Sequence, residues 1–382
     1  MSKKRSRKRS SKRKAGQEVI HPNAAGIDIG AEGSHVAVPE DRDEVSVRSF
    51  GCFTEDLHEL AHWLGACGID TVAMESTGVY WVPLFQILEG YGFEVYLVNA
   101  RHVKNVPGRK TDVLDCQWLQ QLHSFGLLAA SFRPEDEICV LRSYWRHRDS
   151  LTRYAVSHVQ HMQKALEQMN VQLHKVITDV TGVTGMRIID AILDGERDRQ
   201  KLAALKDPRI KSSADRIAKA LDGDYRPEHL FALRQSVETY RFYRQQIAVC
   251  DEQIEAYLSR LGDRVDPTQT PLSPPKSGRK KPRSKQPDFD LRTHLYRISG
   301  VDFTQVEGFD IMTVQTILSE VGLDASKFPS RKNFTSWLGI CPDNRITGGK
   351  VKSSKTRPVK NRAANAFRIA AQAVANSGGP MG

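Results

Sequence analysis

Four acidic residues lie at positions where a carboxylate destabilises the fold unless it is compensated, which makes them candidates for a functional site. Asp28 lies inside the apolar run GIDIG, residues 26–30, whose alternation predicts a strand with Ile27 and Ile29 on the opposite face. Glu75 ends a second apolar run, TVAME, and a loop containing Gly78 follows it. An unpaired carboxylate in such a strand is unfavourable by several kcal/mol unless a cation or hydrogen-bond donors compensate it. The carboxyl end of a strand is also where α/β domains expose their chemistry.

The other two acids open a predicted helix. Asp112 and Asp115 have i, i+3 spacing, which puts them on neighbouring positions of one helix face. The apolar arc through Leu114 and Trp118 includes Asp115, so both acids lean toward the core side. A first-turn cap explains Asp112 equally well when it is taken alone.

The elements around these acids predict one α/β domain. The β-prone runs are 25–30, 34–38, 45–50, 71–74 and 94–98, and the helical runs are 55–67, 82–89 and 112–122. Three antiparallel strands followed by alternating helix and strand indicate an RNase H-like α/β domain over residues 20–130. In that fold the first strand, the fourth strand and a later helix converge, so the four carboxylates would meet. Two Mg²⁺ ions about 4 Å apart would neutralise them and support phosphoryl transfer on nucleic acid.

Charge is concentrated in two tracts. The 382-residue chain has a formal net charge of +11, and nine of the first fourteen residues are Lys or Arg. Six more basic residues lie within 276–285, and the remainder is mildly acidic. Such tracts bind phosphate non-specifically, although a solubility tail or nuclear-import signal has the same composition. No stretch approaches the roughly 20 apolar residues of a membrane span, so we expect a cytoplasmic protein without membrane contact. Six scattered cysteines indicate neither disulfides nor a zinc ribbon.

The rest of the chain is predicted to be mainly helical. Residues 137–262 carry two heptad seams, which predict a coiled-coil hairpin with a small helical cap between its arms. The first seam comprises Val159, Met162, Leu166, Met169, Leu173, Val176 and Val180. The second runs from Leu230 to Leu261 and is broken by Arg244 and Asp251. Residues 263–290 have the composition of a disordered basic linker. Residues 1–19 are likewise predicted to form a disordered basic tail. A mainly α C-terminal domain, 291–382, contains glycine turns able to offer N–H groups to phosphate.

The acidic motifs together resemble a known family. GIDIG, AMESTGVYW and GRKTDVLDCQWLQQL resemble the three acidic motifs of the DEDD-type insertion-sequence transposases, the insertion sequence one-ten family related to the Piv invertase. The stretch that begins ISGVDFTQVEGF resembles the second conserved domain of that family. The resemblance implies a RuvC-like endonuclease domain in which Asp28, Glu75, Asp112 and Asp115 bind Mg²⁺. It also implies a DNA substrate, a bridge RNA that pairs with donor and target DNA, a covalent protein–DNA link, and a dimer or tetramer.

The sequence departs from the family pattern near its C-terminus. Where the family has Ser-Gly-Gly-Lys, this chain has Thr347-Gly348-Gly349-Lys350, so Thr347 is the expected nucleophile, with Ser353 and Ser354 as substitutes. A flexible turn is the alternative interpretation of these four residues. The chain stops soon after Ala370, which predicts a shortened transposase domain. The residues expected to contact nucleic acid are Arg109, Lys110, Arg345, Gly348, Gly349, Lys350, Lys352, Ser353, Arg357 and Lys360.

Two other functions compete with a DNA transposase or recombinase. A catalytically impaired, nucleic-acid-binding descendant of a transposase is favoured by Thr347 and the short tail, but the four intact acids oppose it. GIDIGAEGSHVAV also resembles the first phosphate loop of actin-like ATPases and sugar kinases. Those enzymes need a second Asp-Gly-Gly loop and an adenosine glycine motif, and the sequence contains neither. The ATPase interpretation is therefore remote.

Overall fold

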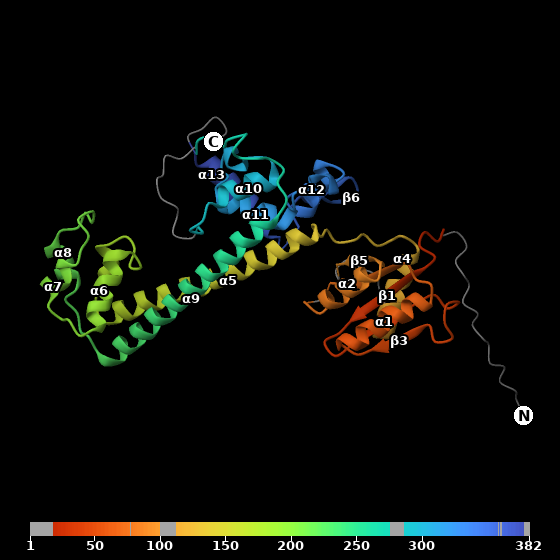
Figure 1. Ribbon diagram of the computed structural model, residues 1–382, viewed down its shortest axis with the longest axis horizontal. Coiled ribbons are helices and arrows are strands. Elements are labelled where there is room, and N and C mark those ends of the chain that lie inside the picture. The colour runs from red at the N-terminus through yellow and green to blue at the C-terminus, as the bar shows by residue number, and fades with distance from the viewer. Residues whose placement is uncertain are drawn as a thin grey trace, which may run out of the picture. The chain divides into compact units, whose positions relative to one another are not determined.

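The computed structural model describes residues 18–76, 78–99, 112–275, 286–357, 359 and 361–377. The chain divides into two compact units, which meet in sequence between Phe132 and Arg133. Figure 1 labels many of the helices and strands of both units. The basic residues of the predicted tail and of 276–285 lie outside the described residues.

The first unit is built on a five-stranded mixed sheet. Its strands are β1 (Ala24–Ile29), β2 (Ser34–Ala37), β3 (Val47–Phe50), β4 (Thr71–Glu75) and β5 (Glu94–Val98). Their order is β3-β2-β1-β4-β5, in which β1, β2 and β3 are antiparallel while β1, β4 and β5 are parallel. This arrangement confirms the predicted RNase H-like α/β fold.

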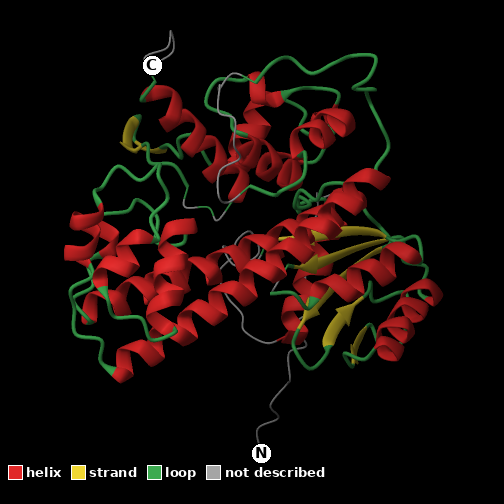
Figure 2. Cartoon of the chain, turned by 60° about the vertical axis from the view of Figure 1, so that its left-hand side comes forward, coloured by secondary structure: helices red, strands yellow, loops and turns green. Residues whose placement is uncertain are grey.

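Helices cover both faces of this sheet (Figure 2). Helix α1 (Thr54–Ala66) and α2 (Trp81–Gly90) share one apolar core with Ile27, Ile29 and Met74 of the strands. Helix α4 (Asp112–Ser124) packs against β1, β2 and β4. Because neighbouring residues of a strand point to opposite faces, Gly26 and Asp28 belong to the face that does not carry Ile27 and Ile29.

The second unit contains two long helices. Helices α5 (Asp136–Gln168) and α9 (Pro227–Arg260) pack against each other over much of their length. They are antiparallel, because the Tyr257 hydroxyl donates to the Glu137 carbonyl oxygen at 2.9 Å while Tyr154 contacts Tyr243 nearer the other end. Coiled-coil packing of the pair stays a prediction.

The structure explains the break at Asp251 in the second seam, and it shows that the first seam ends earlier than predicted. Asp251, an interruption of the second seam, is buried in an ion pair with Arg148 of α5. The first seam was expected to continue to Val180, and this is wrong, because α5 ends at Gln168 and Asn170 takes the left-handed conformation with φ of 56°. Asn tolerates that conformation better than most residues.

The apolar residues beyond α5 enter a small globular core. Leu173, which begins the 3₁₀ helix η1 (Leu173–Lys175), is fully buried, and Val176 and Val180 join the same core. Helices α6 (Val183–Leu193), α7 (Arg199–Ala204) and α8 (Ala214–Ala220) complete it. The heptad-like spacing of these residues therefore reflects burial in a helical cap.

The C-terminal part packs at the other end of the two long helices (Figure 1). Its elements are α10 (Leu291–Ser299), η2 (Phe303–Gln305), α11 (Ile311–Val321), η3 (Ala325–Lys327), α12 (Arg331–Leu338), β6 (Arg345–Thr347), β7 (Lys350–Ser353) and α13 (Arg362–Ala375). Arg146 of α5 pairs with Glu320 of α11, its Nη2 lying 2.6 Å from Oε2. Arg362 of α13 donates to Asp149 of α5 at 3.1 Å. These contacts join the C-terminal part to α5.

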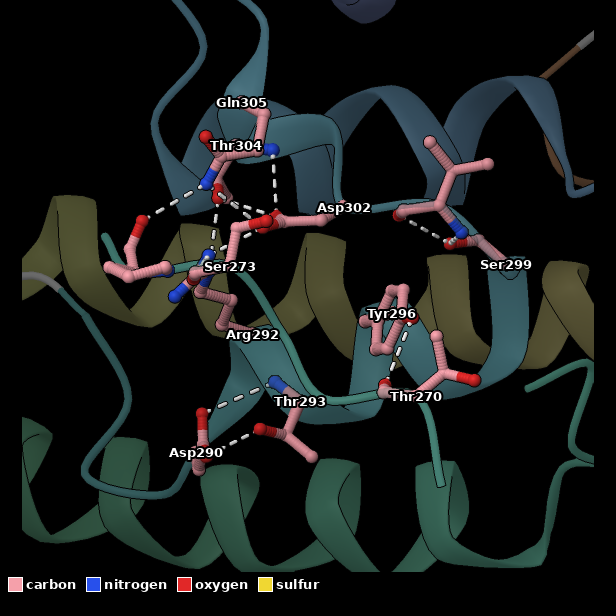
Figure 3. Close-up of polar contacts among 12 residues, drawn as sticks. Thr270, Ser273, Asp290, Arg292, Thr293, Tyr296, Ser299, Asp302, Thr304 and Gln305 are labelled. Carbon is pink, nitrogen blue, oxygen red and sulfur yellow. Dashed lines mark hydrogen bonds and ion pairs between the residues drawn. The ribbon is translucent and has the colours of Figure 1, made fainter. Parts of the chain in front are cut away.

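A polar network ties the chain before residue 276 to α10 (Figure 3). Arg292 donates to the Ser273 carbonyl oxygen at 2.7 Å and also pairs with Asp302. The Tyr296 hydroxyl donates to the Thr270 carbonyl oxygen at 3.1 Å. Residues 270–273, inside the predicted linker, are thus held against the folded unit. No helix among the described residues is long and apolar enough to cross a membrane.

Candidate active site

Asp28 and Glu75 are neighbours at the carboxyl ends of two adjacent strands. Strands β1 and β4 are parallel, and their register pairs Ile27 with Met74. The next positions along the two strands are Asp28 and Glu75, which therefore share one face of the sheet. Both residues are half-buried. Two acids separated by 47 positions in the sequence are thus placed side by side by the strand register.

Helix α4 lies directly on the face that carries these acids. A Cβ atom added at Gly26 would lie 2.3 Å from the Cys116 carbonyl oxygen and 2.3 Å from the Gln120 amide nitrogen, far inside van der Waals contact. Only glycine lets the helix backbone approach β1 so closely. This contact fixes the height of α4 above Asp28.

The direction of α4 brings its first turn to the acidic end of the sheet. Near the end of the helix, His123 Nε2 lies 2.9 Å from the Oγ1 atom of Thr71, the first residue of β4. The helix therefore runs opposite to β1 and β4, with its last turn over the beginnings of the strands. Its first turn, which contains Asp112 and Asp115, consequently lies toward the strand ends that carry Asp28 and Glu75.

The pKa of the Cys116 thiol reflects its burial and the negative charges near it. Burial is the main cause that raises the pKa of Cys116 to about 11, and the negative charges of Asp28 and Asp115 contribute to the same increase. Both carboxylates are therefore close enough to act on the same sulfur atom. A thiol with so high a pKa stays protonated near neutral pH and is a poor nucleophile.

The donor set suits a hard divalent cation. Carboxylate oxygens are the ligands that Mg²⁺ prefers in proteins. The structure brings Asp28, Glu75 and the backbone of the first turn of α4 to one end of the sheet, whereas the Asp112 side chain lies outside the described residues. Among the side chains that are described, no three histidine, cysteine or acidic residues form a metal-binding group. Asp115 was expected to lean toward the core side, but it is exposed, so its carboxylate is accessible to solvent at this end of the sheet.

The TGGK motif forms a tight β-hairpin in the second unit. Gly348 and Gly349 have φ of 57° and 76°, and they connect β6 to β7 as a two-residue turn. Positive φ at both central positions is the geometry of a type I′ turn, which favours glycine strongly. Thr347 pairs with Lys350 across the turn, and both are exposed. Because cross-strand partners point to one side, the Thr347 hydroxyl and the Lys350 ammonium group share a face of the hairpin.

The expected phosphate contacts differ in their surroundings. Lys350 and Lys352 are exposed on β7. Arg357 instead donates from Nη2 to the Ser336 hydroxyl at 2.6 Å, so part of its guanidinium is engaged within the fold. Ser353 Oγ accepts from the Lys355 amide nitrogen at 3.4 Å. Arg109, Lys110, Lys360 and the Arg345 side chain lie outside the described residues.

Sequence reasoning missed the part played by Gly26. The signal was available, because a glycine inside a strand often marks the close approach of another backbone. The sequence could not say which segment approaches, and α4 begins 86 positions later.

Two protein-family profiles match the chain, one over its N-terminal part and one over its C-terminal part. Residues 25–171 match a DEDD-type profile described as a transposase, and this region contains all four acids. Residues 302–380 match a profile described as "Transposase IS116/IS110/IS902 family", and this region contains Thr347. The two matches cover more than half of the chain. No curated protein matches it.

Proposed function

Because the chain belongs to the IS116/IS110/IS902 family of transposases, we propose that it cuts and rejoins DNA by Mg²⁺-dependent chemistry, with Thr347 as its nucleophile. The proposed metal ligands are Asp28, Glu75, Asp112 and Asp115. The observation that carries the metal site is the strand register, which sets Asp28 beside Glu75 on the face that α4 covers.

The chemistry follows from the oxygen ligands and the hydroxyl group. When bound, Mg²⁺ would neutralise the carboxylates and polarise a DNA phosphodiester. The Thr347 oxygen attacks phosphorus, forming a Thr–O–P bond, and the bond from phosphorus to one deoxyribose oxygen breaks. The leaving oxygen takes up a proton, and the Thr347 hydroxyl loses one. Attack by a hydroxyl of a second DNA end reverses these changes, restores Thr347 and completes strand transfer without an external energy source.

Exposed basic residues support contact with nucleic-acid backbone. Lys350 and Lys352 lie on the same hairpin as Thr347, and they would hold phosphates near the hydroxyl. By the resemblance to its family, we propose that a structured bridge RNA selects the DNA and that the protein acts as a dimer or tetramer. Backbone contacts of this kind are strongly weakened by salt.

A catalytically impaired transposase is the second candidate, and Thr347 is the observation that favours it. The additional methyl group of threonine crowds an in-line attack that a serine hydroxyl makes freely. The two candidates differ in whether the wild-type chain forms a covalent adduct with DNA.

The test is an adduct assay on the full-length protein. Wild type, Thr347→Ala and Thr347→Ser are incubated with Mg²⁺, labelled DNA and the RNA transcribed beside the gene, and an SDS-resistant, protease-sensitive adduct is measured. We expect an adduct with wild type that Thr347→Ala abolishes. An adduct that forms only with Thr347→Ser identifies an impaired enzyme, and one that persists in Thr347→Ala refutes this nucleophile.

The metal site is tested separately by strand cleavage. Asp28→Asn and Glu75→Gln retain size while removing negative charge, and each should lower cleavage by at least about 100-fold. Glu59→Gln, an exposed change on α1, is the control and should leave cleavage unchanged. Unchanged cleavage in Asp28→Asn and Glu75→Gln would show that the metal site lies elsewhere.

A further inference from the structure

Two histidines and a tyrosine converge on the outer side of the first unit. His58 and His62 have i, i+4 spacing on α1, so they occupy one helix face. Tyr91 directly follows α2, and its amide nitrogen donates to the Ile87 carbonyl oxygen at 3.0 Å. Leu60 of α1 and Leu88 of α2 are fully buried in the same core. Two packed helices therefore hold the three side chains in place.

The Tyr91 hydroxyl oxygen contacts one ring nitrogen of each histidine. The Tyr91 hydroxyl oxygen lies 3.1 Å from His58 Nδ1 and 3.1 Å from His62 Nε2. The His62 and Tyr91 rings meet edge to face, with an interplanar angle of 85°. A tetrahedral ion with bonds of about 2.0–2.1 Å to nitrogen separates its ligands by roughly 3.3 Å. The separations of the Tyr91 oxygen from the two histidine nitrogens, both 3.1 Å, come close to that value.

We propose that His58, His62 and Tyr91 form a binding site for a divalent transition-metal ion such as Zn²⁺ or Cu²⁺. Imidazole nitrogens favour these ions over Mg²⁺ and Ca²⁺, which prefer oxygen ligands. Water completes the coordination. The tyrosine hydroxyl loses its proton to solvent when it binds the ion, and the two imidazoles bind as neutral rings, so metal affinity increases with pH.

This site is independent of the carboxylates and of the proposed function. Helices α1 and α2 share the core of Ile27 and Ile29, whereas Gly26 and Asp28 belong to the face covered by α4. The sheet therefore separates the two sites. A bound ion would connect α1 to the end of α2, so its effect is to stabilise the first unit.

The experiment measures metal binding by the full-length protein. Metal-free protein is titrated with Zn²⁺ in a calorimeter, with millimolar Mg²⁺ present so that the carboxylates do not compete. Wild type should bind one equivalent, and His58→Gln or His62→Gln should weaken binding at least ten-fold. His147→Gln removes an exposed histidine of α5 and is the matched control, which should bind as wild type does.

Two further readouts test the tyrosine and the stabilisation. Cu²⁺ should give wild type a phenolate-to-copper charge-transfer absorption that Tyr91→Phe removes, although this variant keeps the ring. Zn²⁺ should raise the unfolding temperature of wild type but not that of His58→Gln. Equal Zn²⁺ affinity in wild type, His58→Gln and His62→Gln would overturn the proposal, as would a charge-transfer band that persists in Tyr91→Phe.

Discussion

Replacing Gly26 with alanine should move α4 and disable the proposed metal site. The new Cβ atom would lie 2.3 Å from the Cys116 carbonyl oxygen and 2.3 Å from the Gln120 amide nitrogen, and these backbone atoms cannot rotate away. Restoring the 3.4 Å separation of ordinary contact requires an outward shift of α4 by about 1 Å. The first turn of the helix would carry Asp115 with it.

Both the activity and the stability of the variant follow from this shift. Mg²⁺ demands nearly ideal octahedral geometry with bonds of about 2.0–2.1 Å, so a displacement of about 1 Å would prevent Asp115 from acting as the metal ligand that we propose. Misplacement of that size lowers catalytic rates by about 100-fold. Overpacking of this kind also reduces the free energy of unfolding by about 1–3 kcal/mol.

The assay compares Gly26→Ala with a second glycine of the same unit. A Cβ atom added at Gly65 of α1 meets no atom within 4 Å, so Gly65→Ala should retain cleavage and be neutral or slightly stabilising. DNA cleavage rates are measured with Mg²⁺, and free energies of unfolding by urea denaturation. If Gly26→Ala cleaves within about three-fold of wild type although its stability falls, α4 does not position a metal ligand. Unchanged stability would instead contradict the close packing of α4 on β1.

Two further predictions concern buried charged or titratable groups. Burial lowers the pKa of His123 to about 4, whereas the unfolded chain protonates a histidine near 6.5, so stability should fall by up to about 3 kcal/mol as the pH drops from 6.5 to 4. Urea unfolding at pH 7 and pH 5 should show about 2 kcal/mol of this loss. His123→Gln should reduce the loss, and an equal loss in the variant would assign the pH dependence to another group. Asp251→Ala removes the carboxylate that pairs with the buried Arg148 guanidinium and should reduce the free energy of unfolding by about 3–5 kcal/mol. The double variant Arg148→Met with Asp251→Leu should recover most of that stability, and no recovery would show that the loss has another cause.

Local pattern predicted most elements of the first unit. The helix expected at 55–67 is α1, Thr54–Ala66, and the strand expected at 94–98 is β5, Glu94–Val98. The apolar spacing that marks a strand or a helix repeats every two to four residues, so the sequence alone is sufficient to reveal it. The same kind of reasoning failed beyond Gln168, where an apolar spacing typical of a helix belongs to a turn and a cap core.

The sequence by itself was sufficient to single out the four acids as candidate metal ligands, to predict the RNase H-like order of elements and to show the resemblance to a transposase family. Each of these depends on residue types and short spacings. Only the tertiary structure decided that Asp28 lies beside Glu75, that α4 rests on Gly26, and that Asp251 is paired with Arg148. Each of these contacts joins residues at least 47 positions apart. Strand register and helix packing are set by the simultaneous burial of many side chains, and no local pattern encodes them.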